Sequence, residues 1–436
     1  MDILKYLEKG VTPHQVVKTS AEILTKQGFT ELRLDEPFKL EKGGKYFLSV
    51  FSTSIIAFTI GEKTTAKQQF HIAAAHTDHP CLHIKPKAEM QGGDYLKIDT
   101  EIYGGPIKNT WLDRPLSIAG IVALRGKNAY APVIKYLDFK RPVVTIPNLA
   151  IHFNREVNKG VELKSQSDML PILGPVVKDE SSEKKGKDSK DNEGNEYFLN
   201  AVAAELKCDV KDILDFDLYV YNTDKPEIVG LNSDMISSPR LDNLTSCYAL
   251  LSGITGSARK DGINVAVLFD HEEIGSGTKQ GADSELLENV LKKIYHSLKF
   301  NDDALLDSVS GSFLFSVDVA HAVHPAHGEK YDPVNHCGLN SGVVLKLNSN
   351  QKYTFDTSAV ATAVALCEKA GSKYTKFANH SDVAGGGTLG PIISRHLPMR
   401  TVDIGVPILA MHSARELMGL KDEEDLTKLM KEFYKN

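Results

Sequence analysis

A short acidic stretch stands out as a place where chemistry could occur. In FDHEEIGSGT, residues 269–278, the side chains of Asp270, His271, Glu272 and Glu273 fall within four consecutive residues. They follow the apolar run INVAVLF and precede a glycine-rich turn. Carboxylates this close raise one another's pKa unless a positive charge holds them. The stretch therefore predicts a bound cation, and it raises the question of why two adjacent glutamates are needed.

Histidines and carboxylates recur where other apolar segments end. Such places matter because, in an open α/β sheet, functional groups gather outside the carboxyl ends of the strands. Imidazole and carboxylate ligands without a thiol suit zinc, manganese, cobalt or iron. The clusters are AHTDHP (His76, Asp78), PRLDNL (Asp242), FDHEEIG (Glu272, Glu273), SVDVAH (Asp318, His321) and AMHSARE (His412).

A charge count over these side chains suggests two metal ions. Three carboxylates contribute three negative charges, two divalent cations contribute four positive charges, and a bridging hydroxide balances the set. If one carboxylate bridges, each metal keeps an open position, which marks a catalytic rather than a structural site. Glu272 is then free to take a proton from the metal-activated water and return it to a leaving group. The assumed ligands are His76, Asp242, Glu273, Asp318 and His412.

Each motif alone has a simpler interpretation. Adjacent glutamates are most often a solvated surface pair, and a single histidine after a strand is more often a hydrogen-bonded neighbour than a ligand. GSGTKQG lacks the ending of a phosphate-binding loop, and AGGGTLGP, residues 384–391, is also typical of a flexible loop. The recurrence of metal-competent residues at successive strand ends is what favours a metal site.

The elements that must position these side chains alternate between strands and helices. INVAVLF, SFLFSV and RTVDIGVP predict buried strands, and SELLENVLKKIYHSL and SAVATAVALCEKAG predict helices. This alternation indicates an α/β fold with a mostly parallel sheet flanked by helices. We also expect a helix in TSAEILTKQGF, capped by Thr19 or Ser20, and a last helix that SARELMG opens.

The middle of the chain has a different texture. From residue 82 to about 230, short alternating strands such as YLKIDTEIYGG and PVVTIPNLAIHF surround glycine and proline turns. The charged segment 178–196 predicts a mobile loop. We therefore expect an α/β domain built by residues 1–81 and 231–436, with a β-rich domain, residues 82–230, inserted into it.

The composition of the 436-residue chain excludes several function classes. A formal net charge of -6 argues against a nucleic-acid or anionic-membrane surface. The first residues, MDILKYLEKG, lack the apolar core of a signal peptide, and every apolar stretch is too short to span a bilayer. Five scattered cysteines without a CxxC pair are typical of reduced thiols. We therefore expect a cytoplasmic protein.

Several of these segments together resemble the M18 family of metalloaminopeptidases, the aspartyl-aminopeptidase-like enzymes. They are AAHTDHPCLHIKPK, SPRLDNL, FDHEEIGS, SVDVAHAVHP, LKLNSNQKY, GGGTLGPI and DIGVPILAMHSARE, in the family's order over nearly the whole chain. The resemblance implies a zinc-exopeptidase-like fold and two metal ions, usually zinc, with manganese or cobalt as alternatives. It also implies that the β-rich insertion is a dimerisation domain, and that dimers assemble into a tetrahedral dodecamer with active sites facing an internal cavity.

The resemblance also implies roles for single residues. Asp242 is the bridging ligand, and a cis peptide bond follows it before Asn243. Glu272 is the general base, and Asp78 orients His76. The metal sites implied are His76, Asp242 and Glu273 for one ion, and Asp242, Asp318 and His412 for the other.

Three positions match substrate contacts of the family. His152, in the insertion, resembles a histidine that reaches a neighbouring subunit's site, and His321 resembles a side chain near the scissile carbonyl. Lys346 resembles a lysine that meets an acidic N-terminal side chain, although a strand-edge lysine can instead extend to water. His79 departs from the family, where a small residue is commoner, and it puts an extra imidazole close to the metals.

Three functions remain in competition at this stage. The favoured one is an aminopeptidase that removes an acidic or a neutral N-terminal residue from peptides with a free N-terminus. A different dinuclear hydrolase, such as a deacylase or carboxypeptidase, would share the ligands but anchor its substrate differently. A non-catalytic assembly protein would keep the fold, but the intact set of ligands and base argues against it.

Overall fold

The computed structural model describes residues 2–176 and 197–435 of the chain. It divides into two compact units, one formed by Met1–His79 with Lys225–Asn436 and the other by Pro80–Asp224. We call them the α/β unit and the inserted unit. The charged segment 178–196, predicted to be a mobile loop, lies outside the described residues. Among the helices of the described residues, none has both the length and the apolar character needed to cross a membrane.

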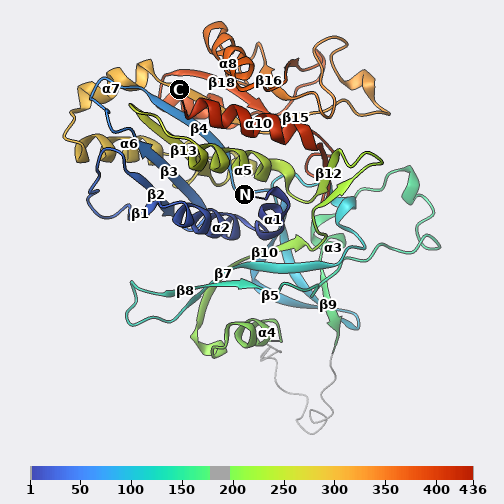
Figure 1. Cartoon of the computed structure of the whole chain (residues 1–436). Helices are drawn as coiled ribbons and strands as arrows, with labels where there is room; N and C mark the ends of the chain where they lie inside the picture. The colour runs from blue at the N-terminus through green and yellow to red at the C-terminus, as the bar shows by residue number, and fades with distance from the viewer. Residues whose placement is uncertain (1, 177–196, 436) are drawn as a thin grey trace. The chain divides into compact units, whose positions relative to one another are not determined.

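The α/β unit is organised around a nine-stranded mixed sheet (Figure 1). Its centre is parallel, because β4 pairs in parallel with β13 and β14, and β14 pairs in parallel with β18. Outside this centre, β3 runs antiparallel to β13, and β16 antiparallel to β18. In spatial order the strands are β1 (Thr30–Glu31), β2 (Lys45–Val50), β3 (Ser54–Ile60), β13 (Ile263–Phe269), β4 (Phe70–His76), β14 (Phe313–Val317), β18 (Arg400–Gly405), β16 (Val343–Leu347) and β17 (Tyr374–Ala378).

Helices cover both faces of this sheet. On β13, Val265 and Val267 belong to one hydrophobic cluster, whereas Ala266 and Leu268 belong to the other. All four side chains are buried, as expected for a strand covered on both faces. The predicted α/β fold is therefore confirmed. One face carries α1 (Ile3–Lys9), α2 (Pro13–Lys26), α5 (Leu241–Gly256), α8 (Thr357–Ala370) and α10 (Leu420–Phe433), and the other carries α6 (Leu286–Ser297), α7 (Asp302–Gly311) and α9 (Leu389–His396).

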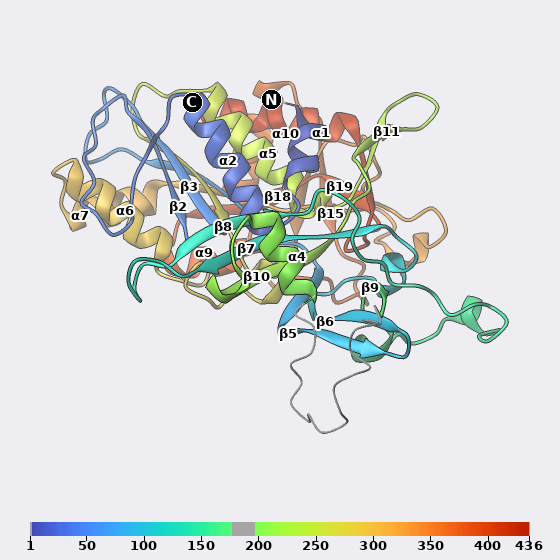
Figure 2. The ribbon, with the colours of Figure 1, turned by 90° about the horizontal axis from the view of Figure 1, so that it is seen from below.

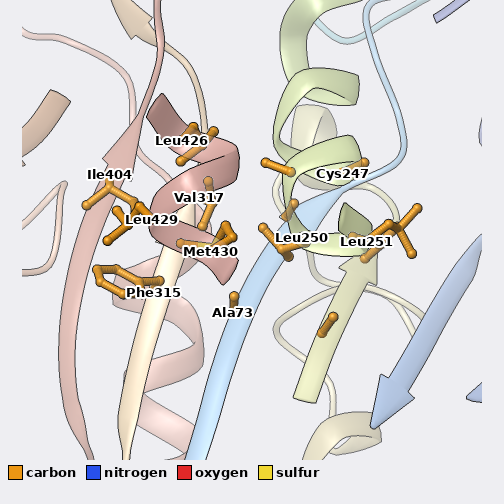
Figure 3. Packing of buried hydrophobic residues seen from close by; sticks show 14 of the residues in the cluster. Ala73, Cys247, Leu250, Leu251, Phe315, Val317, Ile404, Leu426, Leu429 and Met430 are labelled. Carbon is orange, nitrogen blue, oxygen red and sulfur yellow. The ribbon is translucent and has the colours of Figure 1, made fainter. Parts of the chain in front are cut away.

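Helices α5 and α10 pack together over the parallel centre of the sheet (Figures 2 and 3). Leu250 of α5 and Leu429 and Met430 of α10 lie in one buried cluster with Phe315 and Val317 of β14. Burying each such side chain contributes about 1.5–3 kcal/mol. This packing holds the first turn of α5, which carries Asp242, beside the strand ends.

A smaller five-stranded sheet completes the α/β unit. The segment SARELMG, expected to open the last helix, instead contains strand β20, and α10 begins after it. The reason is tertiary pairing, because β20 lies between β12 and β19 and runs antiparallel to both. In spatial order the strands are β11 (Glu227–Val229), β12 (Met235–Ser238), β20 (Glu416–Gly419), β19 (Pro407–Leu409) and β15 (Ala320–His321).

The predicted start of the second helix is also wrong. Helix α2 begins at Pro13, with Thr12 at the N-cap position, so Thr19 and Ser20 lie inside it. Both are buried, and the hydroxyl of Ser20 donates to the carbonyl oxygen of Val16 at 2.7 Å instead of capping the helix. Proline at the first helical position is a strong start signal, because its missing N–H needs no partner there.

The inserted unit is built on a six-stranded antiparallel sheet. The segment PVVTIPNLAIHF, expected to be a strand, forms isolated bridges at Val144 and Thr145, and residues 146–156 have no regular secondary structure. The segment YFLNAVAAEL forms helix α4 (Tyr197–Leu206). The sheet contains β8 (Val133–Asp138), β7 (Leu116–Leu124), β10 (Ile213–Asn222), β5 (Cys81–Gly92), β6 (Tyr95–Tyr103) and β9 (Ile172–Pro175), and a short helix, α3 (Ser165–Asp168), precedes β9.

Candidate metal centre and active-site cleft

Side chains predicted as metal ligands converge at the carboxyl ends of the central strands. Strand β4 ends at His76, β14 ends one residue before Asp318, and β13 leads to a 3₁₀ turn over Glu272–Ile274. The other two predicted ligands come from segments beside the smaller sheet. Asp242 follows β12 at the start of α5, and His412 lies in the turn between β19 and β20. Two sheets therefore supply one site.

Asp242 lies at the centre of this group. Its Oδ1 is 3.4 Å from Nε2 of His76, and its Oδ2 is 3.4 Å from Nε2 of His412. His76 Nε2 is also 3.6 Å from Oδ1 of Asp318, and His412 Nε2 is 3.4 Å from Oε2 of Glu273. One donor atom each from His76, Asp242 and Glu273 lie within 4.8 Å of one another. The predicted cis peptide bond between Asp242 and Asn243 is present.

The donor atoms fit divalent metal ions. Oδ1 of Asp242 and Oε1 of Glu273 are buried and make no hydrogen bond. Buried polar atoms nearly always have a partner, so two such oxygens beside two imidazoles need an explanation. A cation bound between them provides it, because imidazole and carboxylate are the ligands that zinc takes in catalytic sites.

The electrostatics of the cluster also favour positive charge. Burial raises the pKa of Glu272 to about 8, and burial together with Asp242 raises the pKa of Glu273 well above its usual value. Burial alone would lower the pKa of His76, but contacts with Asp242 and Asp318 outweigh it and raise the pKa well above 6.5. The carboxylates around His76 therefore favour positive charge at this place, which a bound metal ion would supply.

Asp78 connects the two central strand ends. Its Oδ1 and Oδ2 accept the backbone N–H groups of Glu272 and Glu273, at 3.2 and 3.1 Å. Nδ1 of His76 lies 3.0 Å from the carbonyl oxygen of Asp78 and 3.4 Å from Oδ1. When Nδ1–H donates in this way, the lone pair of Nε2 faces Asp242. That tautomer is the one a metal ligand needs.

A cleft of about 760 Å³ in the α/β unit contains these side chains. His321 lies at its wall, and burial together with the charge of Lys346 lowers the pKa of the imidazole. The cleft also has glycine-rich and apolar walls that leave room for a substrate. Its lining includes His76, Asp242, Glu272, Glu273, Asp318, His321, Lys346, Lys352, Tyr353, Gly386, Gly387, Thr388, Ile392, Met411 and His412.

Lys346 is not a strand-edge lysine that extends into water, which was the alternative that the sequence left open. It is 2% exposed, and its Nζ donates to the carbonyl oxygens of Asp318 and Val319, both at 3.1 Å. The ammonium also lies 5.0 Å from the ring centre of Tyr353. Extension into water is therefore excluded, and the charge is buried at the wall of the cleft.

Two other histidines lie elsewhere. His152 is exposed, in the irregular segment of the inserted unit, and it is not among the residues that line the cleft. His79 is buried and does not line the cleft, but its ring lies near enough to Asp78, His76 and Asp242 for their charges to act on its pKa, so the extra imidazole is close to the predicted ligands.

Sequence reasoning missed two buried carboxylates near the site. Glu416, in the quoted segment AMHSARE, accepts hydrogen bonds from the backbone of Asp242 and His412. Asp403, in the strand RTVDIGVP, lies opposite Lys346. Asp403 could have been found from the sequence, because it is the one carboxylate in the largely apolar strand RTVDIGVP. Glu416 had no such signal, because the segment was expected to be helical.

Comparisons with known proteins identify the family of the chain. Residues 6–434 match the family model described as Aminopeptidase I zinc metalloprotease (M18). A "Probable M18 family aminopeptidase 2" from Clostridium novyi is 45% identical over 434 residues, which cover 99% of this chain and 98% of the relative. A similar relative from Clostridium acetobutylicum is 43% identical, covering 99% and 97%.

Solved structures show the same similarity. A chain in the cryo-EM structure of the Ape4 and Nbr1 complex has a TM-score of 0.93 and 33% identity, over 99% of this chain and 84% of that one. The mApe1 dodecamer of S. cerevisiae has a TM-score of 0.83 and 26% identity, over 99% and 95%. These names favour the aminopeptidase over the deacylase, carboxypeptidase and non-catalytic alternatives. The chain belongs to the M18 family of zinc metalloproteases, whose members are aminopeptidases that remove N-terminal residues from peptides.

Proposed function

We propose that this chain is a dinuclear-metal aminopeptidase in which Asp242 bridges two divalent ions. The observation that carries the proposal is that the two carboxylate oxygens of Asp242 face different histidines, His76 and His412, each at 3.4 Å. A bridging carboxylate needs this arrangement, with one oxygen directed to each metal. Zinc fits the donor set best, and manganese and cobalt accept the same ligands.

The distances favour a different division of ligands from the one that the family resemblance implied. Asp318 lies beside His76, at 3.6 Å, and Glu273 lies beside His412, at 3.4 Å. We therefore assign His76, Asp242 and Asp318 to one ion, and Asp242, Glu273 and His412 to the other. Glu273 and Asp318 exchange places relative to the expected sites, and the set of five ligands stays the same.

Glu272 is the side chain that we assign as general base. It lines the cleft next to the ligands, and Asp78 holds its backbone N–H. Bound divalent metal supplies Lewis-acid chemistry, lowering the pKa of a water and polarising the scissile carbonyl. Glu272 accepts the proton of that water on its carboxylate and returns it to the amine nitrogen as the peptide bond breaks. The adjacent glutamates thus have separate tasks, Glu273 as ligand and Glu272 as base.

The substrate we propose is a peptide with a free N-terminus, and an acidic first residue is preferred. Two side chains in the cleft support this. His321, whose pKa burial lowers, lines the cleft, and we assign it to contact the scissile carbonyl; the buried ammonium of Lys346 would be the counter-charge for a carboxylate.

We further propose that the protein works as a homo-oligomer, with dimers formed through the inserted unit and assembled into a tetrahedral dodecamer. In the inserted unit, Leu149, Ile151 and Phe153 are 58%, 53% and 80% exposed, on both sides of His152. Exposed apolar side chains gathered in this way mark protein contacts. The five free cysteines, most of them buried, support the cytoplasm as the compartment.

A panel of aminoacyl substrates assayed with zinc, manganese and cobalt tests the proposed activity. We expect peptides with a free α-amino group to be cleaved and their N-acetylated counterparts to remain intact. Metal analysis of the purified protein should give two ions per chain. Equal cleavage of acetylated peptides would point to the deacylase-like alternative, and one ion per chain would contradict the dinuclear assignment.

A further inference from the structure

Glu416 is a buried carboxylate that touches the backbone of two proposed ligands. The side chain is 3% exposed. Its Oε2 accepts the backbone N–H of Asp242 at 3.1 Å, and its Oε1 accepts the backbone N–H of His412 at 2.8 Å. One carboxylate therefore joins the first turn of α5 to the turn between β19 and β20.

Strand pairing determines where this carboxylate lies. Strands β20 and β12 pair antiparallel, and in this pair Glu416 lies opposite Ser238. Ser238 precedes Asp242 by four residues along the chain. The neighbouring Arg415 fastens the same pair, because its Nε donates to Ser237 Oγ at 2.8 Å and its Nη2 to the Ser237 carbonyl oxygen at 2.9 Å. Strand pairing and the Arg415 hydrogen bonds thus hold the backbone of Glu416 beside the segment that leads to Asp242, independently of the bonds that the Glu416 side chain makes.

His412 needs such support more than the other ligands do. It has a φ of 67°, a left-handed conformation that is uncommon for a residue with a side chain. It also lies in a turn, and its side chain is more exposed than those of Asp242 and His76, at 31% against 5% and 1%. The hydrogen bond that its N–H donates to the buried carboxylate of Glu416 restricts the backbone at this position.

We propose that Glu416 is a positioning residue that sets the separation of Asp242 and His412, and so determines the affinity of the metal ion that His412 holds. The proposal rests on the dinuclear site above. Asp78 makes a similar arrangement at the ends of β4 and β13, where its carboxylate accepts hydrogen bonds from the backbone N–H groups of Glu272 and Glu273. Glu416 needs both carboxylate oxygens, because each one receives a backbone donor. An amide at this position would keep one acceptor and direct an N–H₂ group at the second donor.

The experiment measures metal affinity rather than turnover. Chelator-treated wild-type protein and the variant Glu416→Gln are titrated with zinc in competition with a chromophoric chelator. Loss of groups that support ligands typically lowers metal affinity by about 10–100-fold. We expect a loss of that size for one of the two zinc ions bound by Glu416→Gln, and little change for the other. Pairing the variant with His412→Ala identifies the ion, because the affinity that Glu416→Gln weakens should be the one that His412→Ala removes.

Glu423→Gln is the matched control. Glu423 is also 3% exposed, but it lies in the first turn of α10, where its Oε1 accepts from Thr427 Oγ1 at 3.2 Å. Its variant likewise buries an amide in the α/β unit but touches no proposed ligand, so both zinc affinities should stay near wild type. Equal losses in the two variants, or unchanged affinities in Glu416→Gln, would overturn the proposal.

A second variant keeps the test decisive if Glu416→Gln folds poorly. Glu416→Asp retains the carboxyl group but is one methylene too short to reach both N–H groups, so it should weaken binding of the same zinc ion. Full affinity in Glu416→Asp would mean that the position of the carboxyl group does not matter, and would contradict the proposal. Zinc stoichiometry of the wild type reports separately on the dinuclear site, because a single bound ion there would refute the proposed function whatever the variants show.

Discussion

Lys346 lies directly opposite Asp403 on the neighbouring antiparallel strands β16 and β18, and both side chains are buried. Burial raises the pKa of Asp403 to about 6, and the charge of Lys346 opposes that rise. Asp403 Oδ2 accepts the N–H of Thr354 at 2.5 Å, whereas Lys346 Nζ donates to the carbonyl oxygens of Asp318 and Val319. The pair therefore connects the wall of the cleft to the strand end that carries Asp318, a proposed metal ligand.

Specificity for an acidic N-terminal residue should depend on Lys346. In Lys346→Met the stem is kept and the ammonium is lost, so a substrate carboxylate loses a charged hydrogen-bond partner. We expect the ratio of glutamyl to leucyl cleavage to fall about tenfold or more. The ratio is the quantity to measure, because Lys346→Met also removes the hydrogen bond to the Asp318 carbonyl oxygen. That loss would slow the cleavage of both substrates to the same extent and leave the ratio unchanged.

Lys352→Met is the comparison for this prediction. Lys352 also lines the cleft, but it is exposed, and its Nζ donates to the carbonyl oxygens of Ala384 and Gly385 at 3.3 and 2.9 Å. Its loss should change the ratio less than the loss of Lys346. An unchanged ratio in Lys346→Met would show that this lysine is structural, and a large effect in Lys352→Met alone would transfer the role to Lys352.

The sequence predicted the large sheet, and the convergence of candidate ligands at its edge, because local signals there agree with the tertiary structure. Apolar runs such as INVAVLF have enough length and β-branched character to indicate buried strands, and His76, Glu273 and Asp318 lie at or within four residues of the ends of such strands. Residues at strand ends of a parallel sheet meet at one edge, so their proximity followed from the pattern alone.

The smaller sheet was not predictable in the same way. SARELMG has no alternation of polar and apolar residues, and it becomes β20 only because β12 and β19 pair with it. Strand propensity depends on such neighbours more than on the segment itself. For that reason Glu416 escaped notice, and the distances on which the proposed division of ligands rests needed coordinates.

Substitution of the two adjacent glutamates should have different effects on metal content. Glu272→Gln is expected to abolish turnover while both ions remain bound, because the base is not a ligand. Glu273→Gln should lose metal, since a terminal ligand is weakened. Elemental analysis of the two purified variants, beside wild type, is the measurement. Equal metal loss in both variants would remove the distinction between ligand and base.

Stability at mildly acidic pH should depend on His71. Its Nδ1 lies 2.9 Å from the carbonyl oxygen of Phe433, and its ring stacks on Phe433 with centroids 4.8 Å apart. Burial, assisted by the charge of Arg259, lowers the pKa of His71 from 6.5 to about 4. A lowered folded-state pKa contributes stability that is present above pH 6.5 and is lost as the pH falls towards 4. The loss amounts to at most about 3 kcal/mol.

Thermal unfolding of chelator-treated protein between pH 7.5 and 4.5 measures this contribution without interference from metal release. His71→Phe removes the titrating group and the hydrogen bond to Phe433, so the variant should be less stable at pH 7.5. Its unfolding temperature should then fall less steeply than that of wild type as the pH decreases. Parallel curves for the two proteins would show that His71 does not titrate in this range.

Activity should require His152 from a neighbouring subunit. His152 is exposed in the inserted unit, and the residues that line the cleft all belong to the α/β unit. A donor that stabilises the developing negative charge on the carbonyl oxygen is typically worth about a hundredfold or more in rate. We therefore expect His152→Phe to lose at least that much activity with both metals bound, whereas His296→Phe, at another exposed histidine, should remain near wild type.

Mixed assemblies distinguish a contribution in trans from one in cis. His152→Phe and Glu272→Gln are each expected to be inactive alone, one lacking the donor and the other the base. In a dimer of the two, the subunit with intact Glu272 would receive an intact His152 from its partner and recover one working site. Random pairing of symmetric dimers gives heterodimers as about half of the total, so about a quarter of wild-type activity should return. If His152 acts within its own chain, no pairing restores a complete site, and the mixture should stay as inactive as its components. Recovery after co-refolding, and none after mixing the preformed assemblies, would tie the returned activity to subunit exchange.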